Sequence, residues 1–87
     1  MTTPREQIDQ FADENEVELL TADGFDDAII GIGRQFNKHV VVYDTDVVIQ
    51  TLITRDNMTL DDAMEFFEYN IVGAYVGENT PMFMERV

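Results

Sequence analysis

The 87-residue sequence has no cysteine, no tryptophan, one histidine and only two prolines. Without cysteine, the chain can form neither a disulfide framework nor a thiolate metal site. The single histidine, His39, excludes a multi-histidine site within one chain. No apolar run approaches the roughly 20 residues of a membrane-spanning helix, so we expect no membrane partner.

Basic residues are also scarce, because five Lys and Arg stand against 18 Asp and Glu, for a net charge of −13. Residues 1–33 carry nine acids and one base, residues 34–43 two bases, and residues 44–87 nine acids and two bases. Such a chain repels DNA, RNA and anionic lipid, so we expect no direct nucleic-acid binding. Three explanations of the acidity remain: solubility, adaptation to a salty cytoplasm, or a surface that binds a basic protein partner.

Length and composition favour one domain over residues 1–87. A chain of this size buries about 60 to 65% of its unfolded surface and builds a single core. The apolar fraction of 45% is ordinary for a globular protein. The N-terminal MTTPREQ lacks the apolar centre of a signal peptide, so a cytoplasmic location is expected.

The central stretch, residues 23–46, has the pattern of a β-hairpin. Residues 28–36 place successive side chains on alternate faces of an extended chain, and residues 39–43 are rich in β-branched side chains. Both patterns predict a strand. A two-residue turn at Asn37-Lys38 would pair Phe36 with His39 and Ile32 with Tyr43. Further short strands are predicted over 17–21 and 82–87.

Three helices are predicted around this hairpin, over about 4–15, 45–55 and 60–75. Thr3 and Pro4 have the spacing of an N-cap and first helical residue, and Asp44-Thr45-Asp46 supplies a second cap. The last helix has the clearest apolar stripe, formed by Leu60, Ala63, Met64, Phe67, Ile71, Ala74 and Tyr75. The predicted fold class is α+β, a small antiparallel sheet of three or four strands with the helices packed on it.

The carboxylates of the hairpin's open end, Asp23, Asp26, Asp27, Asp44 and Asp46, converge in the predicted register. They could hold a hard cation, which prefers oxygen ligands, although their spacing fits no calcium loop. Alternatively, Asp44 or Asp46 caps a helix and the others solvate a turn. We expect no cofactor, no metal and no catalytic residue, and a small metal-dependent enzyme is the weakest of the functional hypotheses.

The first and last predicted helices carry acidic stripes with almost no Lys or Arg at i+4, which surface helices ordinarily use as partners. Regularly spaced negative charge could imitate a phosphate backbone in the basic groove of another protein. Phe66 and Tyr69 flank the acidic side of the last helix. They either mark an interface or pack under the first helix or the C-terminal strand, and the second alternative is favoured.

Four motifs resemble a family of small, uncharacterised proteins encoded by tailed bacteriophages and some bacterial genomes. They are DGFDDAIIG at 23–31, VVYD at 41–44, RDNMTLDDAMEFFEYN at 55–70 and GAYVGENTP at 73–81. The resemblance implies a phage-like origin and the host cytoplasm as the place of action, and it transfers no catalytic residues. Its motif positions most worth testing are Asp23, Gly24, Phe25, Asp26, Asp27, Tyr43, Asp44, Asn70, Gly73, Gly77 and Glu78.

The sequence therefore predicts a non-enzymatic accessory protein that binds a host or viral protein with a basic surface. The finer hypothesis is an inhibitor that imitates nucleic-acid charge. The alternative is a structural or assembly protein that self-associates, for instance as a homodimer. The predicted interaction residues are Asp23, Gly24, Phe25, Asp26, Asp27, Tyr43, Asp44, Phe66, Tyr69, Asn70, Gly77 and Glu78.

Overall fold

A computed structural model describes residues 3–74 and 76–87. Helix α1 (Pro4–Asn15) is followed by a 3-10 turn η1 (Asp26–Ala28) and by strands β1 (Ile29–Gln35) and β2 (Lys38–Asp44). Helices α2 (Thr45–Asp56) and α3 (Leu60–Phe66), the π-helical turn η2 (Phe67–Val72) and strand β3 (Met82–Met84) complete the chain. The predicted α+β class is confirmed. Of the residues named above, Tyr75 lies outside the described part.

The sheet is mixed, with strand order β1-β2-β3. β1 and β2 are antiparallel, whereas β3 runs parallel to β2. The wholly antiparallel arrangement expected from the sequence is therefore wrong for β3. The chain leaves β2, passes through α2 and α3, and returns in the direction of β2, and such a crossover is what a parallel pair requires.

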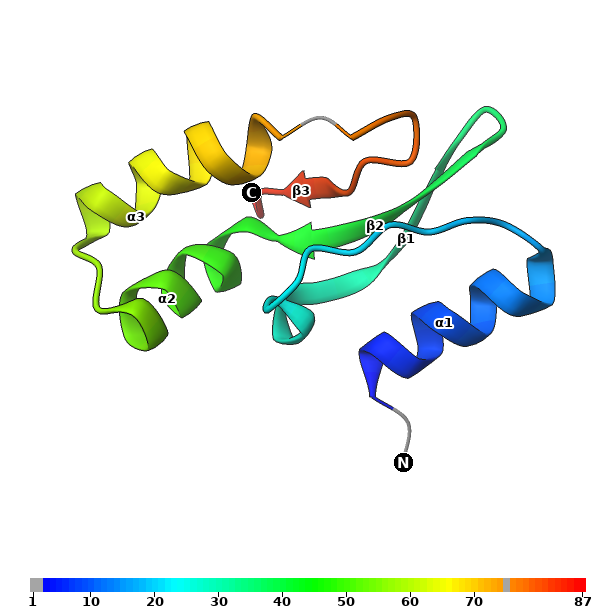
Figure 1. Ribbon diagram of the computed structural model, residues 1–87, viewed down its shortest axis with the longest axis horizontal. Helices are drawn as coiled ribbons and strands as arrows, with labels where there is room; N and C mark the ends of the chain where they lie inside the picture. Colours follow the sequence, from blue (N-terminus) through cyan, green and yellow to red (C-terminus); the bar gives the residue numbers. More distant parts are fainter. Residues whose placement is uncertain (1–2, 75) are drawn as a thin grey trace.

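The molecule is elongated, with principal extents of 40 × 30 × 24 Å. Figure 1 shows the β1–β2 turn at one end of the long axis and the α2–α3 connection at the other. α1 lies along the β1 side of the sheet and α3 beyond β3. Within the described residues, no helix is both long and apolar enough to cross a membrane.

The core forms where β2 meets the helices. Val41 and Tyr43 alternate along β2 toward one face of the sheet and are fully buried. Buried side chains from the helical segments and from the start of η1 complete this cluster: Ile8, Phe25, Ala28, Val48, Leu52, Ala63 and Phe67. Burial raises the pKa of the Tyr43 hydroxyl, which accepts a 2.7 Å hydrogen bond from the backbone N–H of Ala22. Tyr43 is thus a structural residue of the core.

The hairpin forms, but its register differs from the predicted one. Gln35 pairs with Lys38 and Ile32 with Val41, so the turn residues are Phe36 and Asn37. The prediction placed the turn one residue later, because Asn-Lys looks more turn-like than Phe-Asn. Pairing then shifts at Ile30, between Ile29 and Gly31, where a bulge lets the strand reach Tyr43.

The strand predicted over 17–21 is absent, because residues 17–22 have no ladder partner among the described strands. Leu19 and Ala22 still pack against the core. The hydroxyl of Tyr43, rather than a neighbouring strand, accepts the hydrogen bond of Ala22. The alternating hydrophobicity correctly predicted a half-buried extended segment. The prediction that this segment pairs into the sheet is wrong.

The third helix is shorter and more exposed than its stripe predicts. The α-helix ends at Phe66, and at the end of η2 the N–H of Gly73 donates to the carbonyl of Glu68, five residues earlier (3.1 Å). A Cβ at Gly73 would lie 3.1 Å from the carbonyl oxygen of Tyr69, so glycine suits this close ending. The expected core stripe is wrong for Leu60, Met64 and Ala74, which are exposed. Figure 1 shows α3 at the margin of the molecule.

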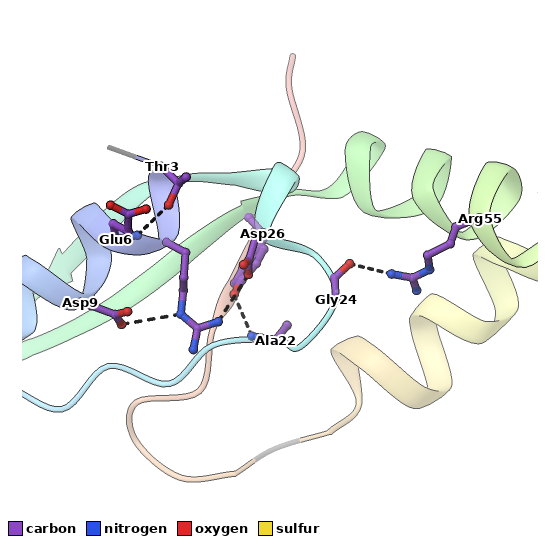
Figure 2. Close-up of polar contacts among 9 residues, drawn as sticks. Thr3, Glu6, Asp9, Ala22, Gly24, Asp26 and Arg55 are labelled. Atoms are coloured by element: carbon purple, nitrogen blue, oxygen red, sulfur yellow. Dashed lines mark hydrogen bonds and ion pairs between the residues drawn. The ribbon is translucent and has the colours of Figure 1, made fainter. Parts of the chain in front are cut away.

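The helix caps follow the sequence closely. The Thr3 hydroxyl accepts a hydrogen bond from the N–H of Glu6 at 3.1 Å and starts α1 (Figure 2). Asp44 starts α2 in the same way, with Oδ1 accepting from the N–H groups of Asp46 (3.0 Å) and Val47 (3.4 Å). Its Oδ2 accepts a 2.8 Å hydrogen bond from Nε of Arg86. This bond, helped by the two backbone donors, holds the pKa of Asp44 below its ordinary value of 3.8.

A pH dependence follows from Asp44. A carboxylate whose pKa is lowered in the folded state contributes stability above its unfolded pKa, and the contribution is lost as the pH falls through the folded value. Arg86→Met should therefore lower Tm at neutral pH, and the gap to the unmodified protein should narrow below about pH 4. Thermal melts of both proteins between about pH 7 and pH 2 measure this gap. A gap that stays constant over that range would contradict the role of Arg86.

Candidate functional site: the acidic–aromatic face of α3

The exposed side of α3 and η2 combines acidic and aromatic side chains. We call this surface the acidic–aromatic face; its residues are Asp61, Asp62, Glu65, Phe66, Glu68 and Tyr69, all exposed. Thr59 caps the N-terminus of the helix, and its hydroxyl accepts a hydrogen bond from the N–H of Asp62 (3.2 Å). Ala63 and Phe67 bury the opposite side of the helix in the core. Anchoring by two residues fixes the direction in which the acidic–aromatic face points.

The acids of this face differ in their structural role. Asp61 and Asp62 lie in the first turn, where the helix dipole favours negative charge. Glu65 and Glu68 lie beyond that turn. They face other acids at i−3 or i−4, spacings at which like charges lower helix stability. Helix stability therefore does not explain why acidic residues occupy positions 65 and 68.

The basic residues of the chain do not neutralise this face. Arg5 pairs with Asp9 and Asp26, Arg55 with Asp56, and Arg86 with Asp44. Within the described residues, no ion pair involves a carboxylate of α3 or η2. The negative charge there is thus available to an external cation.

The aromatic residues of the face are unequal. Tyr69 is 77% exposed and Phe66 is 38% exposed. The favoured alternative from the sequence, packing under neighbouring elements, is wrong for Tyr69; the interface alternative fits its exposure. Tyr69 lies within η2, and π-helical turns are frequent at functional sites. Two exposed aromatics beside unpaired acids have the composition of a protein-binding surface.

A shallow hollow of about 320 Å³ lies at the start of this face. Met58 and Phe66 give it apolar walls, and Asp62 and Glu65 give it acidic ones. An apolar group flanked by positive charge would suit such a hollow. Its four residues have the i, i+4, i+7 and i+8 spacing of one helical face. The prediction missed the hollow because it placed Met58 in the turn before the helix.

The five carboxylates of the hairpin's open end do not converge. Asp44 is buried as the cap of α2, as the capping alternative predicted, and Asp26 contacts Nη1 of Arg5 at 3.5 Å (Figure 2). Asp27 and Asp46 line a separate shallow hollow beside α2, and Asp23 is exposed. In residues 3–74 and 76–87, no three Asp, Glu, His or Cys side chains are grouped to hold a metal ion.

Several other sequence-predicted positions have structural roles. Gly24 has φ +88, and its carbonyl accepts a 2.7 Å hydrogen bond from Nη1 of Arg55 (Figure 2). The Arg55 guanidinium also lies 5.0 Å from the ring centre of the buried Phe25, a cation–π contact. Phe25 and Tyr43 are buried, so a partner cannot contact them directly.

The remaining predicted positions lie near the end of the last helix. Asn70 lines a shallow hollow with Asp23 and Phe83, and Gly77 and Glu78 line a larger one beside the hairpin. Neither group belongs to the acidic–aromatic face. Of the twelve predicted interaction residues, Phe66 and Tyr69 are the two that this face contains.

Three comparisons with known proteins gave no match: no protein-family model, no curated protein and no solved structure resembles the chain. The resemblance to the phage-encoded family therefore stays a prediction from the sequence motifs. The function must be inferred from the surface of the molecule itself.

Proposed function

We propose that this chain is a small phage-type accessory protein that binds a basic surface of a host or viral protein through its acidic–aromatic face. The observation that carries the proposal is the combination of unpaired acids with the exposed ring of Tyr69 on one helix. Charge steers a basic partner to the face and orients it, whereas aromatic rings supply contact area at low entropic cost.

The comparison of α3 with α1 supports this choice of surface. α1 is also acidic, but Arg5 pairs with Asp9, and Gln10 donates a hydrogen bond to Glu14. The aromatic residue of α1, Phe11, contacts the ring of His39 at 5.6 Å between centroids. α1 thus has the composition of an ordinary solvated helix, whereas α3 presents apolar and acidic groups together.

The finer proposal is that the face imitates nucleic-acid charge. Asp61, Asp62, Glu65 and Glu68 repeat along one helix without a basic neighbour on it. A groove lined with Lys or Arg that normally holds phosphates would accept such a row. This form of the proposal expects a partner that itself binds DNA or RNA.

A pull-down tests both the binding of a basic protein partner and the imitation of nucleic-acid charge. The tagged chain is incubated with lysate of a bacterial host at low salt and washed, and bound proteins are eluted stepwise from about 50 mM to about 500 mM salt. The electrostatic screening length shortens markedly over this range. We expect a stoichiometric protein partner with a basic surface that elutes as the salt rises. Added duplex DNA should displace it if the face imitates phosphate charge.

The outcomes distinguish binding of a basic protein from imitation of nucleic-acid charge. A partner that DNA cannot displace but salt releases supports protein binding and contradicts the mimicry. A partner retained at high salt contradicts an electrostatic face altogether. Recovery of the tagged chain bound only to itself would contradict the accessory role.

A further inference from the structure

The hairpin tip differs from the rest of the molecule in charge and in exposure. Phe36, the first turn residue, is 90% exposed. Arg34 and Lys38 flank it on β1 and β2, and neither forms an ion pair within the described residues. They are also the two bases of the segment 34–43, which contains no acid. The tip is therefore a basic, aromatic projection on an acidic protein.

The backbone at this tip is strained. Phe36 has φ +56, in the left-handed region that favours glycine and asparagine and disfavours large side chains. A phenylalanine here gains nothing from burial to offset that cost. An exposed aromatic in a strained turn is a feature from which a functional role can be inferred.

The hollow on α3 complements this projection in chemistry. Its walls are apolar at Met58 and Phe66 and acidic at Asp62 and Glu65. An aromatic ring flanked by two cations would meet apolar contact in the middle and opposite charge at the rim. The hollow is shallow and open, with a volume of about 320 Å³, so a ring would lie against Met58 and Phe66 without being enclosed.

The two features cannot meet within one molecule. The tip lies at one end of the long axis, and the α2–α3 connection that precedes the hollow lies at the other (Figure 1). The longest extent is 40 Å, and the tip is held in place by the β1–β2 ladder. Contact between them requires two copies.

We propose that the hairpin tip of one copy docks into the α3 hollow of a second copy, with Phe36 in the hollow and Arg34 and Lys38 against Asp62 and Glu65. The inference rests on the proposed function in one respect, because it uses part of the same acidic–aromatic face. It adds a binding residue set at the tip and names a second copy of this chain as its occupant. Self-association would then compete with the basic partner for α3.

The experiment uses the purified full chain at about 0.15 M salt, where charges beyond about 8 Å are screened and the local contact dominates the net repulsion. Sedimentation velocity from about 10 µM to about 1 mM measures the average mass, a range suited to weak interfaces. We expect the mass to rise above the 10.0 kDa monomer as concentration increases. A mass that stays at the monomer value would overturn the inference.

Two variants identify the contact. The tip variant is Phe36→Asn with Lys38→Gln, and the hollow variant is Asp62→Lys with Glu65→Lys. Each alone should be monomeric, because one lacks the projection and the other repels it. Mixed in equal amounts, they should form pairs of about twice the monomer mass, because the intact hollow of the first can bind the intact tip of the second. A mixture that stays monomeric, or either variant alone that still associates, would contradict the inference.

Folding and function controls keep these results interpretable. The tip variant should have a Tm equal to or above that of the unmodified protein, since asparagine suits the left-handed region better than phenylalanine. It keeps α3 unchanged, so it should still capture the basic partner in the pull-down. Capture without self-association would refute only this inference, whereas self-association without capture would refute only the proposed function.

Discussion

Replacing Phe67 by alanine should lower the free energy of unfolding by about 3–5 kcal/mol, the cost of emptying a buried aromatic site. Phe67 is 4% exposed, and its ring meets Phe83 edge-on with centroids 5.3 Å apart. Phe83 in turn stacks on the fully buried Tyr43 at 5.6 Å. Loss of this one ring therefore weakens the packing of η2 and β3 against β2. Urea denaturation followed by circular dichroism measures the change.

The neighbouring phenylalanine is a matched control. Phe66→Ala removes the same number of atoms one position earlier, from a side chain that lies on the acidic–aromatic face. We expect its effect on unfolding to be within about 1 kcal/mol. Its effect on capture of the basic partner should exceed that of Phe67→Ala under conditions where both variants are folded. Equal destabilisation by the two substitutions would contradict the orientation of α3.

Reversing the charge of Glu65 and Glu68 together, as Glu65→Lys with Glu68→Lys, should weaken binding of the basic partner by roughly tenfold to a hundredfold. Each exposed ion pair contributes about 0.2–1 kcal/mol, reversal replaces attraction by repulsion of similar size, and 1.4 kcal/mol corresponds to tenfold. Isothermal titration calorimetry with the purified captured partner measures the change. The helix itself should not suffer, because these two glutamates repel acids at i−3 or i−4.

A second double reversal separates local charge from total charge. Asp13→Lys with Glu14→Lys changes the net charge by the same amount, but on the exposed side of α1. Binding should fall only slightly, because those positions lie outside the acidic–aromatic face. Equal weakening by both double variants would show that the partner senses overall charge rather than α3.

The sequence was most informative where the signal is local. Thr3 was recognisable as a cap, and the second cap was narrowed to Asp44 or Asp46, because a hydroxyl or carboxylate before an apolar periodic run satisfies the first free N–H groups. The hairpin was recognisable because alternation and β-branched residues surround a polar turn. The exclusion of Phe66 and Tyr69 from the apolar stripe followed from helical periodicity, and both residues are exposed.

Features that depend on the folded arrangement could not be predicted. The direction of β3 is set by the path through α2 and α3, which periodicity does not encode. Leu60 and Met64 have core spacing, yet they are exposed because none of the described elements covers that side of α3. The exposed tip had a signal, the basic segment 34–43, but the turn position was assigned one residue too late.

Hydrogen–deuterium exchange on the chain alone and saturated with the captured partner tests the central claim most directly. The expected result is slowed exchange over residues 60–72, which carry the acidic–aromatic face, with little change over residues 4–15 of α1. Slowed exchange confined to α1, or none in α3 and η2 despite saturation, would contradict the assignment of this face as the binding surface.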